Sequence, residues 1–314
     1  FSKIIWTYQE KGRTEIIWRK GRMEREKGIL QLADYYEKFE AGNSSAYLII
    51  NENMRDYKAM FGFAELSDKK DEWEELFHLI EEKAKALGYS ALVGPLNYST
   101  WMSYRWAVSR FDLRFFPDCN NPSFYPDYIK ELGYRELYTY RSAEIAIKNP
   151  LNEVGEQIYN EKKAEGYRFV TFEGEEAFSQ VKEVYEISKD AFSDALLYSD
   201  IPYEVFEKLY LSWVKEISIS LIIAYKGEEA IGYVFGYDSP FGKDFISKTS
   251  AVKKEYQKQK IYLALLYLGS ELVKNKGYDT MIYHFQCEQK ETFRRFAEGV
   301  EDNEKRYAVY VKEF

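Results

Sequence analysis

Apolar residues recur every three to four positions in two long segments of the chain, which is the spacing of a helix that buries one face. The first segment is 71–89, where Asp68 is the expected N-cap and Gly88 the expected stop. The second is 256–276, a long helix that ends before Gly277, since glycine is favoured in the left-handed position after a helix. Less regular patterns predict helices over Ile29–Phe39, Phe124–Leu132, Glu176–Phe192, Pro202–Val214 and near Glu291–Ala297.

Short apolar or alternating segments lie between these helices and predict strands. The turn-forming sequence KGEE at 226–229 separates Ile217–Tyr225 from Ala230–Tyr237, which is the pattern of a hairpin. Further strands are expected over Ile4–Tyr8, Glu15–Trp18, Ala46–Ile50, Ala59–Leu66, Ser90–Leu96, Arg135–Ile147, Arg168–Phe172, Phe245–Val252, Thr280–Phe285 and Arg306–Val311. In the second half the elements follow the order β-α-α-β-β-β-α-β-α-β, and this order predicts an α/β (α+β) fold.

Two similar segments indicate a diverged internal duplication. LGYSALVGP at 87–95 and KGYDTMIYH at 276–284 each combine the end of a helix, a Gly-Tyr pair and the start of a strand. We therefore expect two lobes, residues 1–149 and residues 150–314.

The composition narrows the possible functions. A chain of 314 residues is long enough for two domains of roughly 100–200 residues each, and 46% of apolar residues suffices for a sizeable core. The 44 basic and 52 acidic side chains leave a net charge of −8, which argues against general nucleic-acid binding. The cysteines Cys119 and Cys287 cannot form a disulfide framework, and they fit a reducing compartment.

Further classes of protein are disfavoured by what the sequence lacks. No apolar run approaches the roughly 18 residues that a membrane span needs. No signal peptide is visible either, although the chain begins with Phe1. No cluster of Cys and His has the spacing of metal ligands, so no metal site is expected. We expect a cytoplasmic protein without a membrane partner, and a homo-oligomer is possible.

The run AVKKEYQKQKIYLALL at 251–266 resembles the diagnostic segment of the GNAT acyltransferase family. In that family a strand ending in Val leads into a turn of the type Q/R-x-x-G-x-G/A, which opens a long helix. Val252 fits the strand end and Gln257 fits the first position of the turn. The order of elements over about 168–314 is also that family's order. Positions where glycine or another small residue is often found hold Lys258, Lys260 and Tyr262.

The first half resembles the same family over about 46–147. Its runs GPLNYSTW at 94–101 and NNPSFYPDYIKELGY at 120–134 resemble a signature of bacterial tandem GNAT proteins of ill-defined substrate. The resemblance implies two GNAT-like lobes, each a mixed, mostly antiparallel sheet flanked by helices. The sequence SDKK at 67–70 replaces the glycine-containing turn, so the first lobe is expected to bind no cofactor. Two-lobed transferases of this general kind also include the aminoacyl-tRNA-dependent Fem family.

The resemblance implies acetyl-CoA or another acyl-CoA as the acyl donor. A helix N-terminus offers a pyrophosphate unpaired N–H groups and a partial charge of roughly +0.5. The alternative is a degenerate turn whose lysines are merely solvated. The expected cofactor-binding residues are Ala251, Val252, Gln257, Lys258, Gln259, Lys260, Ile261 and Tyr262.

Acyl transfer to an amine needs a group that accepts a proton from the ammonium form of the acceptor. In GNAT proteins the acid is often a tyrosine in the short helix before the last strand, about seven residues after an asparagine. Here Glu288 stands at the place of the asparagine and Arg295 at that of the tyrosine. Glu288 is the candidate catalytic base, against the alternative of a plain surface carboxylate. His284 and Cys287 are expected to be structural.

The loop over 97–122 is longer than the roughly 12–15 residues usual for a connection, which is often a sign of function. Its polar and aromatic side chains either line a pocket between the lobes or form a flap that packs on its own domain. The candidate substrate-binding residues in and beside it are Asn97, Tyr98, Ser99, Asn121 and Tyr125.

Three functions therefore compete. The first is an N-acyltransferase that moves an acyl group, most simply acetyl, from acyl-CoA to a small-molecule or peptide amine. The second is a catalytically degenerate tandem GNAT protein that serves as a binding or scaffold protein. The third is a Fem-like transferase that uses aminoacyl-tRNA, which the acidic net charge of −8 disfavours.

Overall fold

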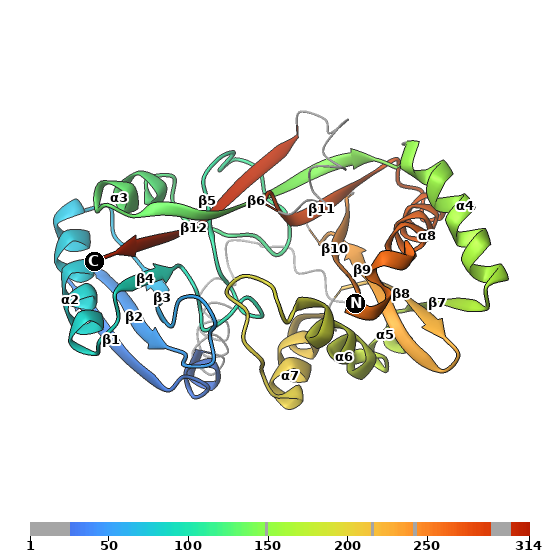
Figure 1. The fold of residues 1–314 in the computed structure, drawn as a ribbon. Helices are drawn as coiled ribbons and strands as arrows, with labels where there is room; N and C mark the ends of the chain where they lie inside the picture. The colour runs from blue at the N-terminus through green and yellow to red at the C-terminus, as the bar shows by residue number, and fades with distance from the viewer. Residues whose placement is uncertain (1–25, 148–149, 215–216, 241–243, 290–302) are drawn as a thin grey trace. The chain divides into compact units, whose positions relative to one another are not determined.

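The computed structural model describes residues 26–147, 150–214, 217–240, 244–289 and 303–314 (Figure 1). These residues form two compact units. The first contains the described residues up to Tyr104 together with Glu313 and Phe314, and the second contains Arg105–Lys312. The expected strands at Ile4–Tyr8 and Glu15–Trp18 and the expected helix near Glu291–Ala297 lie outside the described residues.

The first unit is a sheet packed against one long helix. Its strands follow the order β1-β2-β3-β4, with antiparallel pairs except for β3 and β4, which are parallel. Trp73, Phe77 and Ile80 lie on the buried face of the helix, and the ring of Phe77 meets Phe61 of β3 edge-on at 5.0 Å. The bounds are β1 Tyr35–Ala41, β2 Ser44–Ile50, β3 Ala59–Glu65, α2 Lys70–Ala86 and β4 Ala91–Gly94.

A carboxylate in the first turn of α2 ties the helix to the β1–β2 hairpin. Glu72 accepts hydrogen bonds from the hydroxyl of Ser67 at 2.6 Å and from the backbone N–H of Asn43 at 2.8 Å. These bonds, helped by an ion pair with Lys69, lower the pKa of Glu72 to about 2. The N-cap of α2 is Lys69 rather than the expected Asp68, and no side chain caps the helix there; the hydroxyl of Ser67 accepts from the N–H of Lys69.

We expect Glu72→Gln to change the acid sensitivity of the first unit. A carboxyl group whose pKa is lowered in the folded state stabilises that state above its unfolded pKa, near 4.5, and this stabilisation fades as the pH falls toward 2. The wild-type protein should therefore be more stable than the variant at pH 6, and the two should converge between about pH 4 and pH 2. Urea unfolding at several pH values measures this; a constant difference would contradict the role given to the carboxylate.

The second unit is built on a mixed, mostly antiparallel sheet. Its strands follow the order β12-β6-β11-β10-β9-β8-β7, and the short strand β5 pairs with β12. Among these pairs only β10 and β11 are parallel in the described part of the chain. The bounds are β5 Trp106–Ala107, β6 Arg135–Ala146, β7 Tyr167–Glu173, β8 Ile219–Lys226, β9 Glu229–Asp238, β10 Phe245–Val252, β11 Thr280–Cys287 and β12 Glu304–Glu313.

Helices cover both faces of this sheet (Figure 1). On one face α8 packs through Ile261 and Leu265 onto β8 and β9, with α4 against it. On the other face Ser188 of α6 hydrogen-bonds the phenol of Tyr233 at 2.8 Å. The bounds are α3 Tyr125–Glu131, α4 Pro150–Ala164, α5 Glu175–Phe178, α6 Val181–Phe192, α7 Tyr203–Val214 and α8 Ile261–Asn275. The expected α/β (α+β) class, with a mostly antiparallel sheet flanked by helices, is confirmed.

A strand from the first half of the sequence lies inside the sheet of the second unit. β6, which precedes Pro150, pairs on one side with β11 and on the other with β12, and both pairs are antiparallel. The sheet therefore combines strands from both lobes expected from the sequence. The lobe limits 1–149 and 150–314 stay a prediction.

Two expected helices differ from the structure near the start of the described residues and in the second unit. The helix expected over Ile29–Phe39 is wrong, because residues from Tyr35 onward alternate between partly buried and exposed positions and form the edge strand β1. The helix expected over Glu176–Phe192 is divided into α5 and α6, which the chain separates at Ser179 and Gln180.

Two further differences concern the start of α8 and the presence of α4. The helix expected over 256–276 begins only at Ile261, after a short 3₁₀ helix over Lys254–Gln259. The helix α4 was not expected, although Pro150 at its first position and two lysines in its last turn are typical helix signals. None of the helices in the described part of the chain has the length and apolar character that a membrane crossing requires.

Candidate functional site

The strands β10 and β11 part at the place where the sequence predicts cofactor binding. They pair in parallel only between Ile246 and Ile282 and between Ser247 and Tyr283. From there to Val252, β10 continues to pair with β9, with no further described pairing to β11. Backbone N–H and C=O groups at such a separation lack neighbours within the sheet, so they are available to a slender ligand.

Both strands carry an irregularity where they part. In β10 the register with β9 shifts between Ser247 and Thr249, so Lys248 is the inserted residue of a β-bulge. In β11 the register with β6 shifts between Tyr283 and Gln286, and Phe285 has a φ of 56°. Left-handed backbone at a bulky residue costs on the order of 1–3 kcal/mol and is concentrated at functional sites. The two bulges give Lys248 and Phe285 directions that regular strands would not.

In the turn into α8, a lysine adopts the backbone conformation that glycine would adopt more easily. Lys260 follows the 3₁₀ helix with φ 62° and ψ 12°, which is the left-handed region, and α8 begins at the next residue. Glycine adopts this conformation with less steric cost. The side chains of Gln257, Lys258 and Lys260 are exposed, so they leave the start of the helix uncovered.

Two acidic side chains, one in α6 and one just after this helix, occupy part of this turn. Asp190 accepts a hydrogen bond from the backbone N–H of Lys254 at 2.6 Å, and Asp194 forms an ion pair with the ammonium of the same lysine. The amide of Gln257 donates to the carbonyl of Val252 at 3.1 Å. The two carboxylates lower the positive potential that an anionic ligand would meet here.

Aromatic side chains lie on the helix side of the parting strands. The phenol of Tyr262 hydrogen-bonds Ser250 of β10, and burial raises its pKa. Burial, and then the neighbouring Tyr262, raise the pKa of Tyr283 on β11. The cavity beneath α8 that Tyr283 and Ser247 line measures about 20 Å³, which is room for roughly one water molecule. A pantetheine arm would therefore need these side chains to move.

Hydrogen bonds fix the tautomer of His284 on β11. Its Nε2 lies 2.8 Å from the carbonyl oxygen of Pro117, which only accepts, so Nε2 carries the proton. Nδ1 then accepts from the hydroxyl of Ser142 at 2.8 Å, and that oxygen accepts from the N–H of Phe285 at 3.1 Å. Burial, followed by the charge of Lys248, lowers the pKa of His284 well below its usual value. With both nitrogens engaged, the neutral ring positions the loop before α3 instead of moving protons.

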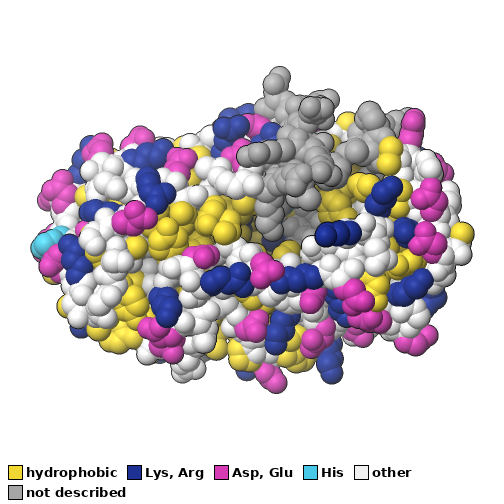
Figure 2. Space-filling model, viewed as in Figure 1, with side chains coloured by type: hydrophobic (Ala, Val, Ile, Leu, Met, Phe, Trp, Pro, Cys, Tyr) yellow, Lys and Arg dark blue, Asp and Glu magenta, His cyan; other side chains and the backbone are white. Residues whose placement is uncertain are grey.

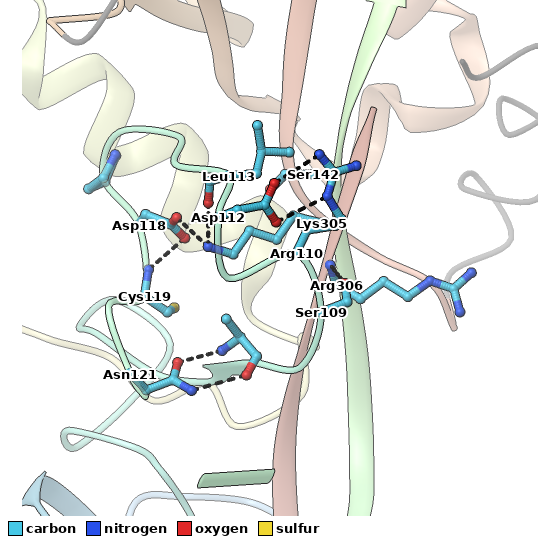
Figure 3. Close-up of polar contacts among 12 residues, drawn as sticks. Ser109, Arg110, Asp112, Leu113, Asp118, Cys119, Asn121, Ser142, Lys305 and Arg306 are labelled. Carbon is cyan, nitrogen blue, oxygen red and sulfur yellow. Dashed lines mark hydrogen bonds and ion pairs between the residues drawn. The ribbon is translucent and has the colours of Figure 1, made fainter. Parts of the chain in front are cut away.

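A buried ion pair holds the same loop against β12 (Figure 3). The ammonium of Lys305 lies 2.7 Å from a carboxylate oxygen of Asp118 and 2.7 Å from the carbonyl of Leu113. The two charged side chains are only 3% and 8% exposed. Cys119 donates its N–H to the other oxygen of Asp118 at 2.8 Å, and burial raises the pKa of its thiol to about 12. The thiol therefore stays protonated at neutral pH.

Two more cations of the second unit meet at Phe285. The guanidinium carbon of Arg105 is 3.9 Å from the centre of the Phe285 ring and 4.3 Å from that of Tyr140. The ammonium of Lys248 is 5.7 Å from the same Phe285 ring. Burial, and then the charge of Arg105, lower the pKa of Lys248 to about 8. A lysine with such a pKa is a frequent feature of functional sites.

The candidate substrate residues of the first unit are engaged within that unit. The side-chain oxygen of Asn97 accepts from the N–H of Phe63 at 2.7 Å. Tyr98 is buried, and its carbonyl accepts from the side chain of Asn51 at 3.2 Å. Ser99 is fully buried. These contacts hold the first residues of the loop within the first unit, and a role in substrate binding stays a prediction.

The remaining candidates lie in the second unit. The amide of Asn121 accepts from the N–H of Ala107 at 2.7 Å and donates to its carbonyl at 3.1 Å, so it acts like a short strand partner for β5. Tyr125 opens α3 and packs edge-on against Trp106 at 4.9 Å. Asn121 and Tyr125 thus hold the loop around β5, and their part in substrate binding also stays a prediction.

The candidate base Glu288 directly follows β11. Its backbone N–H donates to the carbonyl of Thr139 at 3.0 Å, and its carboxylate, 19% exposed, lies 3.6 Å from the guanidinium of Arg306. No measured contact joins it to Lys248 or to the turn before α8 among the described residues. Its catalytic role therefore stays a prediction that rests on the sequence.

Metal and nucleic-acid sites find no support in the described residues. No group of three or more His, Cys, Asp or Glu side chains in that part of the chain is placed to hold a metal ion. Figure 2 shows basic and acidic side chains interspersed over the face drawn, without a broad field of one sign. Binding to a phosphate backbone normally uses such a positive field.

Comparison with known proteins gives likenesses of fold. No protein-family model and no curated protein matches the sequence. A tandem GNAT protein from the clavulanic acid biosynthesis pathway is 12% identical with a TM-score of 0.49, and the match covers 86% of this chain and 78% of that one. A GCN5-related N-acetyltransferase from Sphaerobacter thermophilus is 14% identical with a TM-score of 0.47, over 87% of this chain and 81% of that one. L-PGS from Bacillus licheniformis is 12% identical with a TM-score of 0.42, over 91% and 90%.

A tandem GNAT protein and a GCN5-related N-acetyltransferase are thus among the solved structures that this chain is similar to. At such low identity, the likenesses do not tell what this chain binds or which reaction it catalyses. The functional argument therefore depends on the chain's own residues.

The residues that the sequence did not single out are Lys248, Ser142, Asp118 and Lys305. Lys248 carried a signal, because a lysine in the middle of the otherwise uncharged strand FISKTSAV is unusual for a buried sheet. The contact between Asp118 and Lys305 joins residues 187 positions apart, and no local pattern announces it.

Proposed function

We propose that the second unit binds an acyl-CoA and transfers its acyl group, most simply acetyl, to the amine of a small molecule or peptide. The observation that supports this most is the parting of β10 and β11 after the pairs at Ile246 and Ser247, beside the turn into α8. A thioester arm that enters there would find backbone hydrogen-bond partners along β10.

The residues of the turn fit a pyrophosphate in part. The start of α8 offers the N–H of Ile261 to a pyrophosphate, whereas the N–H of Leu263 already donates to the carbonyl of Lys260 at 3.0 Å. Lys258 and Lys260 add positive charge. Asp190 opposes an anion at the start of the turn. When bound, the donor would supply a thioester carbonyl that reacts with a neutral amine. The proposed binding residues remain Ala251, Val252, Gln257, Lys258, Gln259, Lys260, Ile261 and Tyr262.

Side chains of this chain would donate and accept the protons of the reaction and exclude water from the opening between β10 and β11. The phenols of Tyr262 and Tyr283 stay protonated at neutral pH, because burial raises the pKa of each, so both are available as proton donors. Their rings also exclude water from the inner part of the opening. Glu288 remains the proposed acceptor of the proton that the amine loses.

A binding protein without transfer activity is the second candidate. Two observations favour it: Tyr262 fills a position where a small residue would leave room, and the carboxylate of Asp190 already occupies an amide of the turn. A third candidate, transfer from aminoacyl-tRNA, lacks a positive surface on the face shown in Figure 2. Binding of tRNA that weakens steeply with salt would revive it.

Titration calorimetry of the full chain with acetyl-CoA tests the proposal. We expect binding to the wild-type protein and a loss of about tenfold or more in affinity for Lys260→Glu, because the variant places a negative charge at the helix start. Lys208→Glu is the control, since Lys208 is an exposed residue of α7 with the same change of charge. Similar losses in both variants would contradict a site at the turn.

Two other results separate the candidates. Absence of heat up to millimolar acetyl-CoA would overturn the acyl-CoA proposal and leave the fold alone. Binding without release of free thiol, when a panel of amines is added, would favour the binding protein over the transferase.

A further inference from the structure

Lys248 lies at the inner end of the place where β10 and β11 part. It is the inserted residue of the bulge between Ser247 and Thr249, and Ser247 makes the last parallel pair with β11. Its ammonium faces the ring of Phe285, the bulged residue of the opposite strand, at 5.7 Å. The bulges of two neighbouring strands therefore direct one cation and one aromatic ring toward the same space.

The ammonium of Lys248 has no hydrogen-bond acceptor and no carboxylate partner among the described residues. Its environment contains the ring of Phe285 and the charge of Arg105, which repels it. Ammonium groups withdrawn from water are normally paired, because desolvation of an unpaired charge is costly. Elsewhere in the described sheet, Lys253 at the end of β10 shows the usual arrangement, with Glu229 at 2.7 Å.

The charged groups around this space are positive in excess. The charges that act on the buried ring of His284 are those of Lys248, Arg105 and Lys305, and the ring itself is neutral. The charges that act on the neighbouring Cys119 are those of Arg105, Asp118 and Lys305. Asp118 is already bound by Lys305 at 2.7 Å. Among the described groups that act on these two residues, three are cations and one is a carboxylate.

We propose that Lys248, supported by Arg105, binds a compact anionic group, a carboxylate or a phosphate, of the molecule that accepts the acyl group. An anion would relieve the repulsion between the two cations and give the ammonium of Lys248 a partner that the described residues do not supply. The acceptor would thus be an amine that also carries an anion, such as an amino acid, the end of a peptide or a phosphorylated amine. The part that concerns the acceptor rests on the proposed function, whereas the anion site itself does not.

Nuclear magnetic resonance of the full chain, labelled with carbon-13 at the lysine ε position, tests the site directly. The signal of Lys248 is assigned from its absence in Lys248→Met, and its titration is followed in chloride, acetate and inorganic phosphate at equal ionic strength. We expect the midpoint, about pH 8 in chloride, to rise by about one unit in the anion that binds, which corresponds to about tenfold preference for the charged amine. Acetate and phosphate distinguish a carboxylate site from a phosphate site.

Variants decide where the anion binds. Calorimetry with the effective anion should show at least about tenfold weaker binding for Lys248→Met, while Lys248→Arg retains it and exposed Lys208→Met leaves it unchanged. The part of the binding that Lys248→Met removes should persist in Lys260→Glu. A midpoint that neither anion moves overturns the proposal, and so does anion binding that Lys260→Glu abolishes and Lys248→Met preserves.

The acetyl-CoA titration separates this inference from the proposed function. If acetyl-CoA fails to bind but an anion still moves the titration of Lys248, the acyl-CoA proposal fails and the anion site stands. If acetyl-CoA binds while neither anion moves the titration midpoint of Lys248, the anion site fails and the acyl-CoA proposal stands.

Discussion

Replacing Lys305 by methionine should destabilise the second unit by about 3–5 kcal/mol, the usual cost of leaving the partner of a buried ion pair alone. The side chain of Lys305 is 3% exposed and that of Asp118 is 8% exposed, so water cannot take over from the missing ammonium. The carbonyl of Leu113, which also accepts from Lys305 at 2.7 Å, loses its partner as well. Urea unfolding of the full chain measures the change.

A double variant distinguishes an ion pair from simple packing. Lys305→Met combined with Asp118→Leu removes both charges and keeps the volume similar, so it should recover most of the stability that the single variant loses. Lys312→Met, near the other end of β12 and half-buried, is the matched control and should change stability by less than about 0.5 kcal/mol. Equal losses in the single and double variants would show that the charges are not what holds the loop.

This ion pair also bears on the site. The loop that Asp118 anchors presents the carbonyl of Pro117 to His284, and Ser142 links that ring to the N–H of Phe285. A loosened loop would therefore disturb the bulge at Phe285, on which Arg105 is stacked. Loss of the ion pair is expected to affect the anion site through these contacts, although neither Asp118 nor Lys305 lies in the parting of the strands.

Local patterns predicted much of the fold, because a regular apolar period within one segment is enough to predict a strand or a helix. The hairpin of β8 and β9 and the left-handed Gly277 after α8 were expected and are present. The insertion of β6 between β11 and β12 was not expected, since it depends on pairs such as Ala143 with Tyr283 that are far apart in the sequence. No periodicity within β6 could choose its neighbours.

The candidate site also has a part that the sequence predicted and a part that it did not. The strand end at Val252 and the turn before α8 were expected from a run of sixteen residues, and the structure places a turn there. The sequence did not show that Lys260 adopts the left-handed conformation itself, because lysine rarely does so. It also did not show the grouping of Arg105, Lys248 and Lys305, which come from three distant segments and meet only through the sheet.

Lys248→Met should make the protein more stable at pH 7, by about 2–3 kcal/mol, which is opposite to the usual effect of a substitution inside a sheet. Burial and the charge of Arg105 lower the pKa of Lys248 from 10.5 to about 8. Below pH 8 the amine is charged in both the folded and the unfolded chain, so the folded state bears the full cost of withdrawing this half-buried charge from water. Methionine, which is similar in length and has no charge, removes that cost.

The difference in stability between the wild-type protein and Lys248→Met should change with pH in a defined direction. Between pH 8 and pH 10.5 the unfolded chain binds more protons at this lysine than the folded chain, so the wild-type protein gains stability as the pH rises. The advantage of the variant should therefore shrink over this interval and vanish above it. Urea unfolding at pH 7, 9 and 10.5 measures the difference, with Lys208→Met as a control that stays near zero throughout.

Saturation with the anion that binds at Lys248 should narrow the difference at pH 7, because the anion compensates the charge in the wild-type protein and has no partner in the variant. A lysine that merely fills space would give a variant of equal or lower stability, with a difference that neither pH nor the anion alters. Among the described residues the ammonium of Lys248 has no anionic partner, and an anion site without its ligand is expected to carry this cost in stability.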